Sequence, residues 1–515
     1  MGGFRSRAAS NRDNSSGSQP ARSGMSKGYQ QRRSADKKMK AKSHGSGDRV
    51  RDVAFTALQA VTVEEAFGNI VLPQLLKEHK LSGRDAAFAT ELTYGTLRAA
   101  GLLDAVIEKA SGRPVGKIDS IVLDILRLGT YQILRTRVDD HAAVHTSVEL
   151  AKAHGAAPAK GFVNGVLRTI TRSTPEQWLD RVAGGEGLAD LALRHAHPEW
   201  IAEVFNDALS GAGETGVASQ LEEALRADDE RPRVHLAARP GQMSAEELAL
   251  VTGGDEGRYS PYAVYVDHGA PGDLEPVRDG LATVQDEGSQ LIALAVTRAP
   301  LEREDQGRWL DLCAGPGGKT GFMAAWAMGE QARVDAVELA PHRAELVRKS
   351  VRDLPVDVHV GDGRYPASID TLDIPSGGFD RVLVDAPCTG LGALRRRPEA
   401  RWRKSPEDVA PLVTLQKELL RAALAATAEG GVTVYSTCSP HPQETSAVVR
   451  AIAAETGAEI LDTASLVPEV DGLEPGPFVQ LWPHKHGTDA MFFAALRPAR
   501  KDSAGRRADA ETEVE

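Results

Sequence analysis

The stretch DLCAGPGGKT, residues 311–320, decides the fold of the C-terminal half of this chain, because it joins an apolar strand-like run to a helical one. A glycine-rich turn at such a junction lets the backbone approach a ligand closely. A Walker A loop is excluded, because counting back from Gly318 places Cys313 where its first glycine is required. A dinucleotide fingerprint is incomplete, because Thr320 stands at the position of its third glycine. The turn therefore predicts a nucleotide-type cofactor site that follows neither phosphate-binding pattern.

Strand-like and helical segments alternate around this turn from residue 308 onward. This β-α-β order predicts a mostly parallel sheet with helices on both faces, a Rossmann-like α/β domain that we assign to residues 291–498. The last two strand candidates are separated by only a short loop and therefore suit an antiparallel pair at or near the end of the sheet. The strand candidates read RWLDLCAG, VDAVEL, VDVHVGD, FDRVLVDAP, GGVTVYSTC, FVQLWP and AMFFAALRP.

Acidic residues stand at the ends of three of these strands. Glu338 ends the second strand about 20 residues after the turn, where a carboxylate can accept hydrogen bonds from both hydroxyls of a ribose. Asp362 follows the third strand and Asp385 ends the fourth. NAD and S-adenosylmethionine both use the ribose contact, but a row of acids suits a cofactor with a sulfonium cation and an amino group better than one with a pyrophosphate. We therefore expect S-adenosylmethionine.

The chain has three cysteines, and none of them makes a CxxC pair. Three thiols cannot form a disulfide framework in a chain of 515 residues. Cys388, in VDAPCTGLG, follows the fourth strand, and Cys438, in VYSTCSP, ends the fifth, so both belong at the ligand-binding edge of the sheet. Cys313 is more simply explained as a small side chain that packs the turn.

Two thiols beside a methyl donor suit one particular chemistry. Carbon 5 of cytosine is a poor nucleophile, and addition of a thiolate to carbon 6 makes an enamine-like adduct whose carbon 5 can take the methyl group. One cysteine must attack, and another group must help the product to leave. Asp385 is placed to hydrogen-bond the pyrimidine as negative charge builds up, and Lys319 is a second candidate that would also lower the pKa of a nearby thiol.

The rest of the chain divides by composition into four further segments. Residues 1–48 are rich in Ser, Gly, Lys and Arg and predict a disordered basic arm. Residues 49–175 show apolar spacings of three and four and predict an all-helical domain, and residues 176–290 predict a small α/β linker or RNA-binding domain. Residues 499–515 predict a second disordered tail.

The charge of the chain is distributed unevenly. The net charge is −11, but residues 1–50 hold twelve Lys or Arg against three Asp or Glu. We therefore expect the protein to contact RNA through local basic patches, because its overall charge is negative. The segment LRRRPEARWRK, residues 394–404, follows Cys388 closely and places six cations around one indole, a combination that suits phosphates and an exposed base. The residues we predict to bind RNA are Arg395, Arg396, Arg397, Arg401, Trp402, Arg403 and Lys404.

The motifs DLCAGPGGKT, VDAPCTGLG, YSTCSP and LWPHKHGTDAMFFA resemble those of the RsmB/Sun (Fmu) family of RNA cytosine-5 methyltransferases, as does VQDEGSQ at 284–290. The helical segments LDILRLGTYQIL, HAAVHTSVELAK and KGFVNGVLR resemble the NusB-like domain of these enzymes. The family usually has Ala where this chain has Gly315, and Ser where it has Thr389.

This resemblance implies roles for individual residues. Cys438 is implied as the nucleophile and Cys388 as the residue that assists release of the product. The substrate implied is small-subunit (16S) ribosomal RNA, although related family members modify other RNAs. The implied cofactor contacts are Cys313, Ala314, Gly315, Pro316, Gly317, Gly318, Lys319, Glu338, Asp362 and Asp385.

Two other functions remain open from the sequence. One is a non-catalytic RNA-binding or ribosome-assembly protein of the NusB type, and the other is a nicotinamide dehydrogenase, which the incomplete fingerprint and the two thiols disfavour. The N-terminus lacks an apolar signal segment and no run of about 18 apolar residues occurs, so we expect a cytoplasmic protein without a membrane partner. We expect no metal, since His141 and His145 have no third ligand nearby, and no obligate protein partner is evident.

Overall fold

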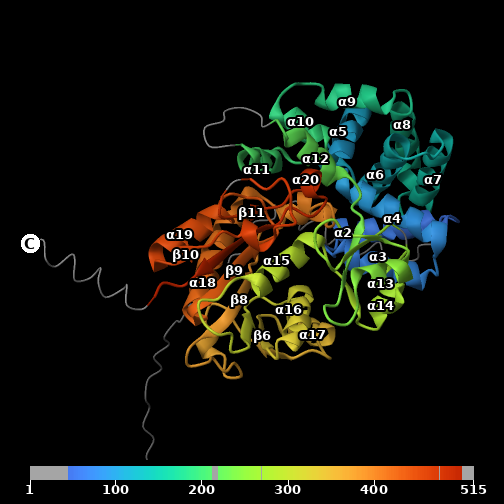
Figure 1. The fold of residues 1–515 in the computed structure, drawn as a ribbon. Helices are drawn as coiled ribbons and strands as arrows, with labels where there is room; N and C mark the ends of the chain where they lie inside the picture. The colour runs from blue at the N-terminus through green and yellow to red at the C-terminus, as the bar shows by residue number, and fades with distance from the viewer. Residues whose placement is uncertain (1–44, 211–218, 268, 475, 501–515) are drawn as a thin grey trace, which may run out of the picture. The chain divides into compact units, whose positions relative to one another are not determined.

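The computed structural model describes residues 45–210, 219–267, 269–474 and 476–500 (Figure 1). Most of the predicted basic arm, residues 1–48, and of the predicted tail, residues 499–515, lies outside the described residues. Within the described ranges, no helix combines the length and the apolar character that a bilayer crossing requires.

The N-terminal part is all helical, as the apolar spacing predicts. Aspartates begin several of its helices: the carboxylates of Asp48, Asp119 and Asp139 accept hydrogen bonds from backbone N–H groups of the first turn. The apolar faces of most of these helices meet in one core, in which Leu58 and Ile125 are buried, and Leu72 of α3 packs in a smaller cluster with Val53 and Ala89. The helices are α2 (Arg49–Thr62), α3 (Gly68–Glu78), α4 (Gly83–Arg98), α5 (Ala100–Ser111), α6 (Ser120–Arg135), α7 (Asp140–Ala153) and α8 (Lys160–Ile170).

A mixed region joins this helical part to the large sheet. It starts with four helices, of which the first begins with a capping box between Thr174 and Gln177. An antiparallel sheet in the order β2-β3-β1-β4 follows, with two short helices against it. The helices are α9 (Pro175–Ala183), α10 (Leu188–Arg194), α11 (Glu199–Leu209), α12 (Leu221–Asp229), α13 (Ala245–Thr252) and α14 (Glu275–Arg278). The strands are β1 (Val234–Ala238), β2 (Asp255–Glu256), β3 (Ala263–Val266) and β4 (Ala282–Val284).

The C-terminal sheet is mixed and follows the order β10-β12-β9-β8-β5-β6-β7, with β11 paired to β12. The five strands from β5 to β9 are parallel, and the pairs made by β12 are antiparallel, as predicted for the end of the sheet. The sequence did not indicate β10, which is only two residues long. The strands are β5 (Arg308–Asp311), β6 (Arg333–Glu338), β7 (Val356–Val360), β8 (Phe379–Asp385), β9 (Thr427–Thr437), β10 (Glu459–Ile460), β11 (Val479–Gln480) and β12 (Phe492–Arg497).

Helices cover both faces of this sheet, because successive side chains of each buried strand point to opposite sides. In β8, Leu383 packs on the face of α15 (Glu287–Arg298) and α16 (Gly318–Gly329). Val382 and Val384 pack on the other face, which is covered by α18 (Val409–Ala426) and α19 (Ser446–Thr456), labelled in Figure 1. The helix α17 (Pro341–Ser350) follows β6 and contributes Val347 to the core of the α16 face.

The strand order determines where a ligand can bind. The chain enters the parallel sheet at β5 and continues outward through β6 and β7, then returns to place β8 and β9 on the other side of β5. Ligands of such sheets bind at the carboxyl ends of the strands beside this reversal. The turn at 311–320 and the residues that follow β6, β7, β8 and β9 therefore share one edge.

Candidate active site

Two thiols meet at the carboxyl edge of the sheet. The sulfur atoms of Cys388, in the loop after β8, and Cys438, directly after β9, lie 3.4 Å apart. The loops are fixed by backbone hydrogen bonds: Ala386 N–H donates to Ser436 O at 2.9 Å, and Gly392 N–H donates to Cys438 O at 2.9 Å. The third cysteine, Cys313, packs against the core on the α18 face, which agrees with the packing role expected for it.

The surroundings differentiate the two thiols. The hydrogen bond from Cys388 lowers the pKa of Cys438, and the positive charges of Lys319 and Arg397 lower it further, against the opposing effects of burial and of Asp385. The same contact raises the pKa of Cys388 well above its ordinary value, and burial and nearby carboxylates add to this. Cys438 is therefore the thiol that ionises first, and Cys388 is the one that keeps its proton.

Lys319 and Asp385 form an ion pair beside these thiols. The Lys319 ammonium lies 2.8 Å from Asp385 Oδ2, and the Ser436 hydroxyl donates to Asp385 Oδ1 at 3.0 Å. Burial alone would lower the pKa of Lys319, but Asp385 and the neighbouring Cys438 raise it, so the ammonium is stabilised. The structure thus brings together the four residues that the sequence predicts for catalysis: Cys438, Cys388, Asp385 and Lys319.

The glycine-rich turn is held by two carboxylates. Asp311 accepts hydrogen bonds from the Thr320 hydroxyl at 2.7 Å and from Cys313 N–H at 3.2 Å. Burial raises the pKa of Asp311 to about 6, and the nearby charge of Asp385 adds to this. In the middle of the turn, Glu338 accepts a hydrogen bond from Gly315 N–H at 3.1 Å.

Gly315 faces the carboxylate of Glu338 directly. A Cβ at this position would lie 2.1 Å from Glu338 Oε2 and 3.0 Å from the Arg343 guanidinium. Arg343 in turn donates to the Gly315 carbonyl at 2.6 Å. The glycine is therefore required here by this arrangement of Glu338 and Arg343, and Arg343 is a neighbour that the sequence did not indicate.

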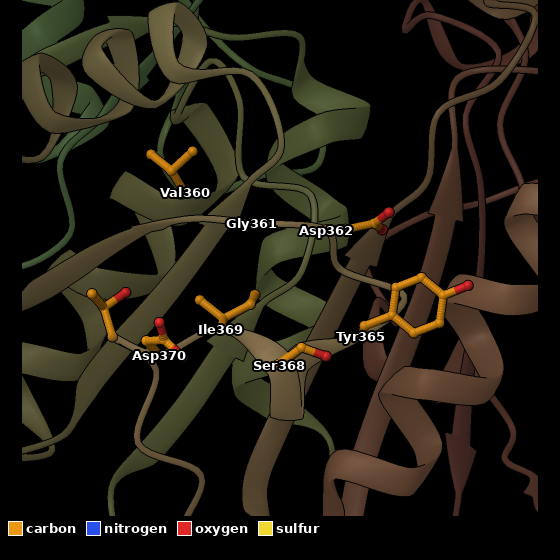
Figure 2. Close-up of a pocket in the computed structure, with 8 residues that line it drawn as sticks. Val360, Gly361, Asp362, Tyr365, Ser368, Ile369 and Asp370 are labelled. Carbon is orange, nitrogen blue, oxygen red and sulfur yellow. The ribbon is translucent and has the colours of Figure 1, made fainter. Parts of the chain in front are cut away.

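Asp362 borders a cavity of about 440 Å³ after β7. Figure 2 shows Val360 and Asp362 along one wall of this cavity and Ser368–Asp370 along the other. Asp362 forms an ion pair with Arg364 at 2.7 Å, which lowers the pKa of the Asp362 carboxyl. The half-exposed ring of Tyr365 completes this end of the cavity.

The basic segment 394–404 is placed differently from the prediction. Arg395 and Arg401 are buried in ion pairs: Arg395 lies 2.7 Å from Asp489, and Arg401 lies 2.7 Å from Asp228. The structure contradicts the prediction that these two guanidinium groups bind RNA, because both side chains are buried and cannot reach a phosphate at the surface. The partners come from distant parts of the chain, which sequence spacing does not reveal.

Trp402 and Arg403 of the same segment contact the N-terminal helices. The Trp402 indole packs so closely on Gly101 that a Cβ there would lie 2.1 Å from the ring, and its N–H donates to Arg98 O at 3.4 Å. Arg403 donates to Val61 O at 2.6 Å. Trp402 is only partly buried and Arg403 is exposed, so base stacking on Trp402 and phosphate binding by Arg403 remain predictions.

Arg396 is engaged as well, with Asp286 at 2.7 Å and Asp489 at 2.9 Å. Arg397 differs from its neighbours, because its side chain is exposed, and its charge acts on Cys438. Lys404 is partly exposed. RNA binding by Arg397 and Lys404 remains a prediction.

Sequence reasoning missed Glu444, which lies between β9 and α19 and is fully buried. Its carboxylate accepts hydrogen bonds from Thr389 N–H at 2.8 Å and from the Ser439 hydroxyl at 2.7 Å, residues that directly follow the two cysteines. In the sequence this residue looks like an ordinary acid at the start of a helix, and only the topology of the sheet brings its donors together.

Comparison with known proteins assigns both halves of this architecture to families. Residues 298–497 match the model described as 16S rRNA methyltransferase RsmB/F, and residues 48–172 match the NusB family. The fold and the site therefore define a Rossmann-like methyltransferase that carries an N-terminal NusB domain.

Relatives extend this result over most of the chain. A putative methyltransferase of Mycobacterium tuberculosis is 56% identical over 454 residues, which cover 87% of this chain and 96% of that protein. The ribosomal RNA small subunit methyltransferase B of Cronobacter sakazakii is 33% identical over 87% of this chain and 98% of its own length. The crystal structure of PH0851 shares the fold, with a TM-score of 0.72 and 20% identity over 88% of this chain and 99% of that one. The chain belongs to the RsmB/F methyltransferase family.

Proposed function

We propose that this protein transfers a methyl group from S-adenosylmethionine to carbon 5 of a cytosine in small-subunit ribosomal RNA, through a covalent bond between Cys438 and carbon 6 of the base. The observation that carries the proposal is the 3.4 Å separation of the Cys388 and Cys438 sulfurs beside the Lys319–Asp385 ion pair. A single thiol at this edge would have suited many functions. Two thiols, one with a lowered pKa and one with a raised pKa, suit a mechanism in which a bond between sulfur and substrate is formed and then broken.

The residues around the turn fit this cofactor. Residues 313–319 would provide backbone contacts, Glu338 would accept hydrogen bonds from the ribose, and the cavity beside Asp362 would take the adenine end. The carboxylates Glu338, Asp362 and Asp385 match the positive charge of the methyl donor better than they would match a pyrophosphate. When bound, S-adenosylmethionine supplies an electrophilic methyl group on a sulfonium cation.

Cys438 begins the reaction on the base. Its thiolate, favoured by the hydrogen bond from Cys388 and by Lys319, adds to carbon 6 and makes carbon 5 electron-rich. To the Lys319–Asp385 pair, which lies beside the thiols, we assign the stabilisation of the negative charge that builds up on the pyrimidine ring.

Cys388 acts after carbon 5 has been methylated. The proton on carbon 5 must then pass to a water molecule as the base, its C–H electron pair must restore the double bond between carbons 5 and 6, and the bond between sulfur and carbon 6 must break so that its electron pair returns to Cys438 as the thiolate. We assign assistance in this release to Cys388, because its protonated thiol lies 3.4 Å from the sulfur that has to leave and can donate a hydrogen bond to the thiolate that forms.

The RNA is proposed from the relatives and from cations of the basic segment that are not buried. The relatives in Bacillus subtilis and Cronobacter sakazakii are named ribosomal RNA small subunit methyltransferase B, the former as a probable one. Arg397, exposed beside the thiol pair, and Lys404 are the residues of the basic segment that we assign to RNA phosphates.

Nucleoside analysis tests the proposal. The protein is incubated with a transcript of small-subunit ribosomal RNA and isotopically labelled S-adenosylmethionine, and the RNA is digested and separated by liquid chromatography with mass detection. We expect the label in 5-methylcytidine. Label in any other nucleoside overturns the cytosine-5 assignment, and binding of RNA without transfer to naked RNA or to small-subunit particles supports the NusB-type assembly function instead.

A further inference from the structure

The carboxylate of Glu444 connects the loops that carry the two cysteines. Thr389, which follows Cys388, donates to it from both its backbone N–H and its hydroxyl. Ser439, which follows Cys438, donates its hydroxyl at 2.7 Å. Each loop therefore binds the same carboxylate through the residue next to its cysteine.

A helix on the face of the sheet completes this arrangement. The Gln416 side chain, on α18, donates to Glu444 at 3.1 Å and to Pro387 O at 2.9 Å. Glu444 is fully buried, and the donors named here are all uncharged. A buried carboxylate that relies on neutral donors costs more free energy than an apolar side chain of the same size, so its presence calls for a specific role.

We propose that Glu444 is a positioning residue for the release step: it fixes the Cys388 thiol against the sulfur of Cys438, so that Cys388 can act on the adduct as soon as carbon 5 is methylated. This inference rests on the covalent mechanism proposed above. It assigns Glu444 no contact with the RNA or with the cofactor.

The electrostatics of the pair agree with this role. The negative charge of Glu444 adds to the contact with Cys438 and to burial in raising the pKa of Cys388. Cys388 then keeps its proton and donates a hydrogen bond to the Cys438 thiolate before the attack. Cys438 is reactive in this state. No bond to Glu444 is made or broken at any point of the reaction.

The first test replaces Glu444 by glutamine, which keeps the volume but turns one acceptor into a donor that faces other donors. We expect kcat for methyl transfer to fall at least tenfold, with KM for RNA and for S-adenosylmethionine within twofold of the wild type. We also expect a covalent protein–RNA band on a denaturing gel, because the adduct forms but is released slowly.

A matched control separates positioning from loss of stability. Glu287 is also fully buried and accepts hydrogen bonds from two backbone N–H groups, those of Tyr259 at 2.7 Å and Ser260 at 2.8 Å, but it lies at the start of α15 and these donors belong to the mixed region. Glu287→Gln should lower the unfolding temperature and leave kcat within twofold, with no adduct. If Glu444→Gln behaves like this control, the positioning role is wrong.

A second pair of variants keeps the test decisive if Glu444→Gln does not fold. Thr389→Val removes the hydroxyl that donates to Glu444 and keeps the shape, whereas Thr389→Ser keeps the hydroxyl. We expect slow release and a visible adduct for Thr389→Val, and wild-type release for Thr389→Ser. Equal release by the two overturns the inference. Failure of the wild type to form 5-methylcytidine at all would instead overturn the proposed function.

Discussion

The guanidinium of Arg401 lies 2.7 Å from the carboxylate of Asp228, and both side chains are completely buried. Arg401 belongs to the segment that follows the Cys388 loop, and Asp228 ends the last helix before the small sheet. His197 contacts the same carboxylate at 2.9 Å. This contact ties the loop beside the thiols to helices more than 170 residues earlier in the chain.

Removing Arg401 should therefore destabilise the whole protein. Arg401→Ala leaves Asp228 as a buried charge without its cation, and we expect a loss of about 3–5 kcal/mol in the free energy of unfolding. Arg421→Ala is the control, because its ion pair with Glu455 is largely exposed and should contribute less than about 1 kcal/mol. Denaturant unfolding measures both, and equal losses would contradict the expected difference.

Cys438→Ala should abolish methyl transfer and leave the cofactor site intact. In the proposed mechanism the thiolate makes carbon 5 reactive, and alanine cannot form the bond to carbon 6. Transfer is measured with labelled S-adenosylmethionine, and cofactor affinity is measured by calorimetry. Substantial residual transfer would remove Cys438 from the role of nucleophile.

Cys388→Ala should cause a covalent protein–RNA adduct to accumulate, whereas Cys438→Ala should form none. The adduct with Cys438 still forms, but its release is slowed, so a protein–RNA complex that survives denaturation should accumulate. Cys313→Ala is the control, because this thiol packs in the core and should give no such band. If no complex accumulates with Cys388→Ala, this residue has no part in release.

Removal of the Lys319 charge should shift the pH dependence of Cys438. The reactive form is the thiolate, so its alkylation by iodoacetamide rises as the pH passes upward through the pKa of Cys438. Lys319 lowers that pKa and neutralises Asp385, which raises it. Lys319→Met should therefore move the rise to higher pH, by about one unit for a tenfold loss of thiolate. Mass spectrometry of the Cys438 peptide measures this, and an unchanged profile would contradict it.

Arg397→Ala should weaken RNA binding more than it affects stability. The side chain is exposed beside the thiols, and a single phosphate contact should lower the slope of log affinity against log salt by about one. Fluorescence anisotropy with a labelled RNA at several salt concentrations measures this slope. Arg421→Ala on α18 is again the control, and the same effect from both variants would mean that only net charge matters.

The fold and the thiol pair could be predicted from the sequence because both depend on local patterns. The alternation of strand-like and helical segments indicated the parallel strands, and the end of each strand placed Cys388, Cys438 and Asp385 at one edge. The short strand β10 was not predictable, since two residues carry no periodicity.

The burial of Arg395 and Arg401 was not predictable for a different reason. Arg395 and Arg401 look like exposed cations in sequence, because arginine is rarely buried without a partner. Their partners, Asp489 and Asp228, are separated from them by 94 and 173 residues. Glu444 is a similar case, since its donors come from separate loops that only the folded sheet brings together.

Backbone hydrogen bonds hold the two loops that carry the thiols in place. Gly392 N–H donates to Cys438 O, and Gly392 O accepts from Ala490 N–H, each at 2.9 Å, so the two loops are joined to each other and to the start of β12. We therefore expect the nucleotide to make the conformational change, by rotating out of its stack to reach the sulfur. The choice of site would then reflect how easily each cytosine opens, and cytosines in loops or unfolded helices would be modified before those held in stable duplexes.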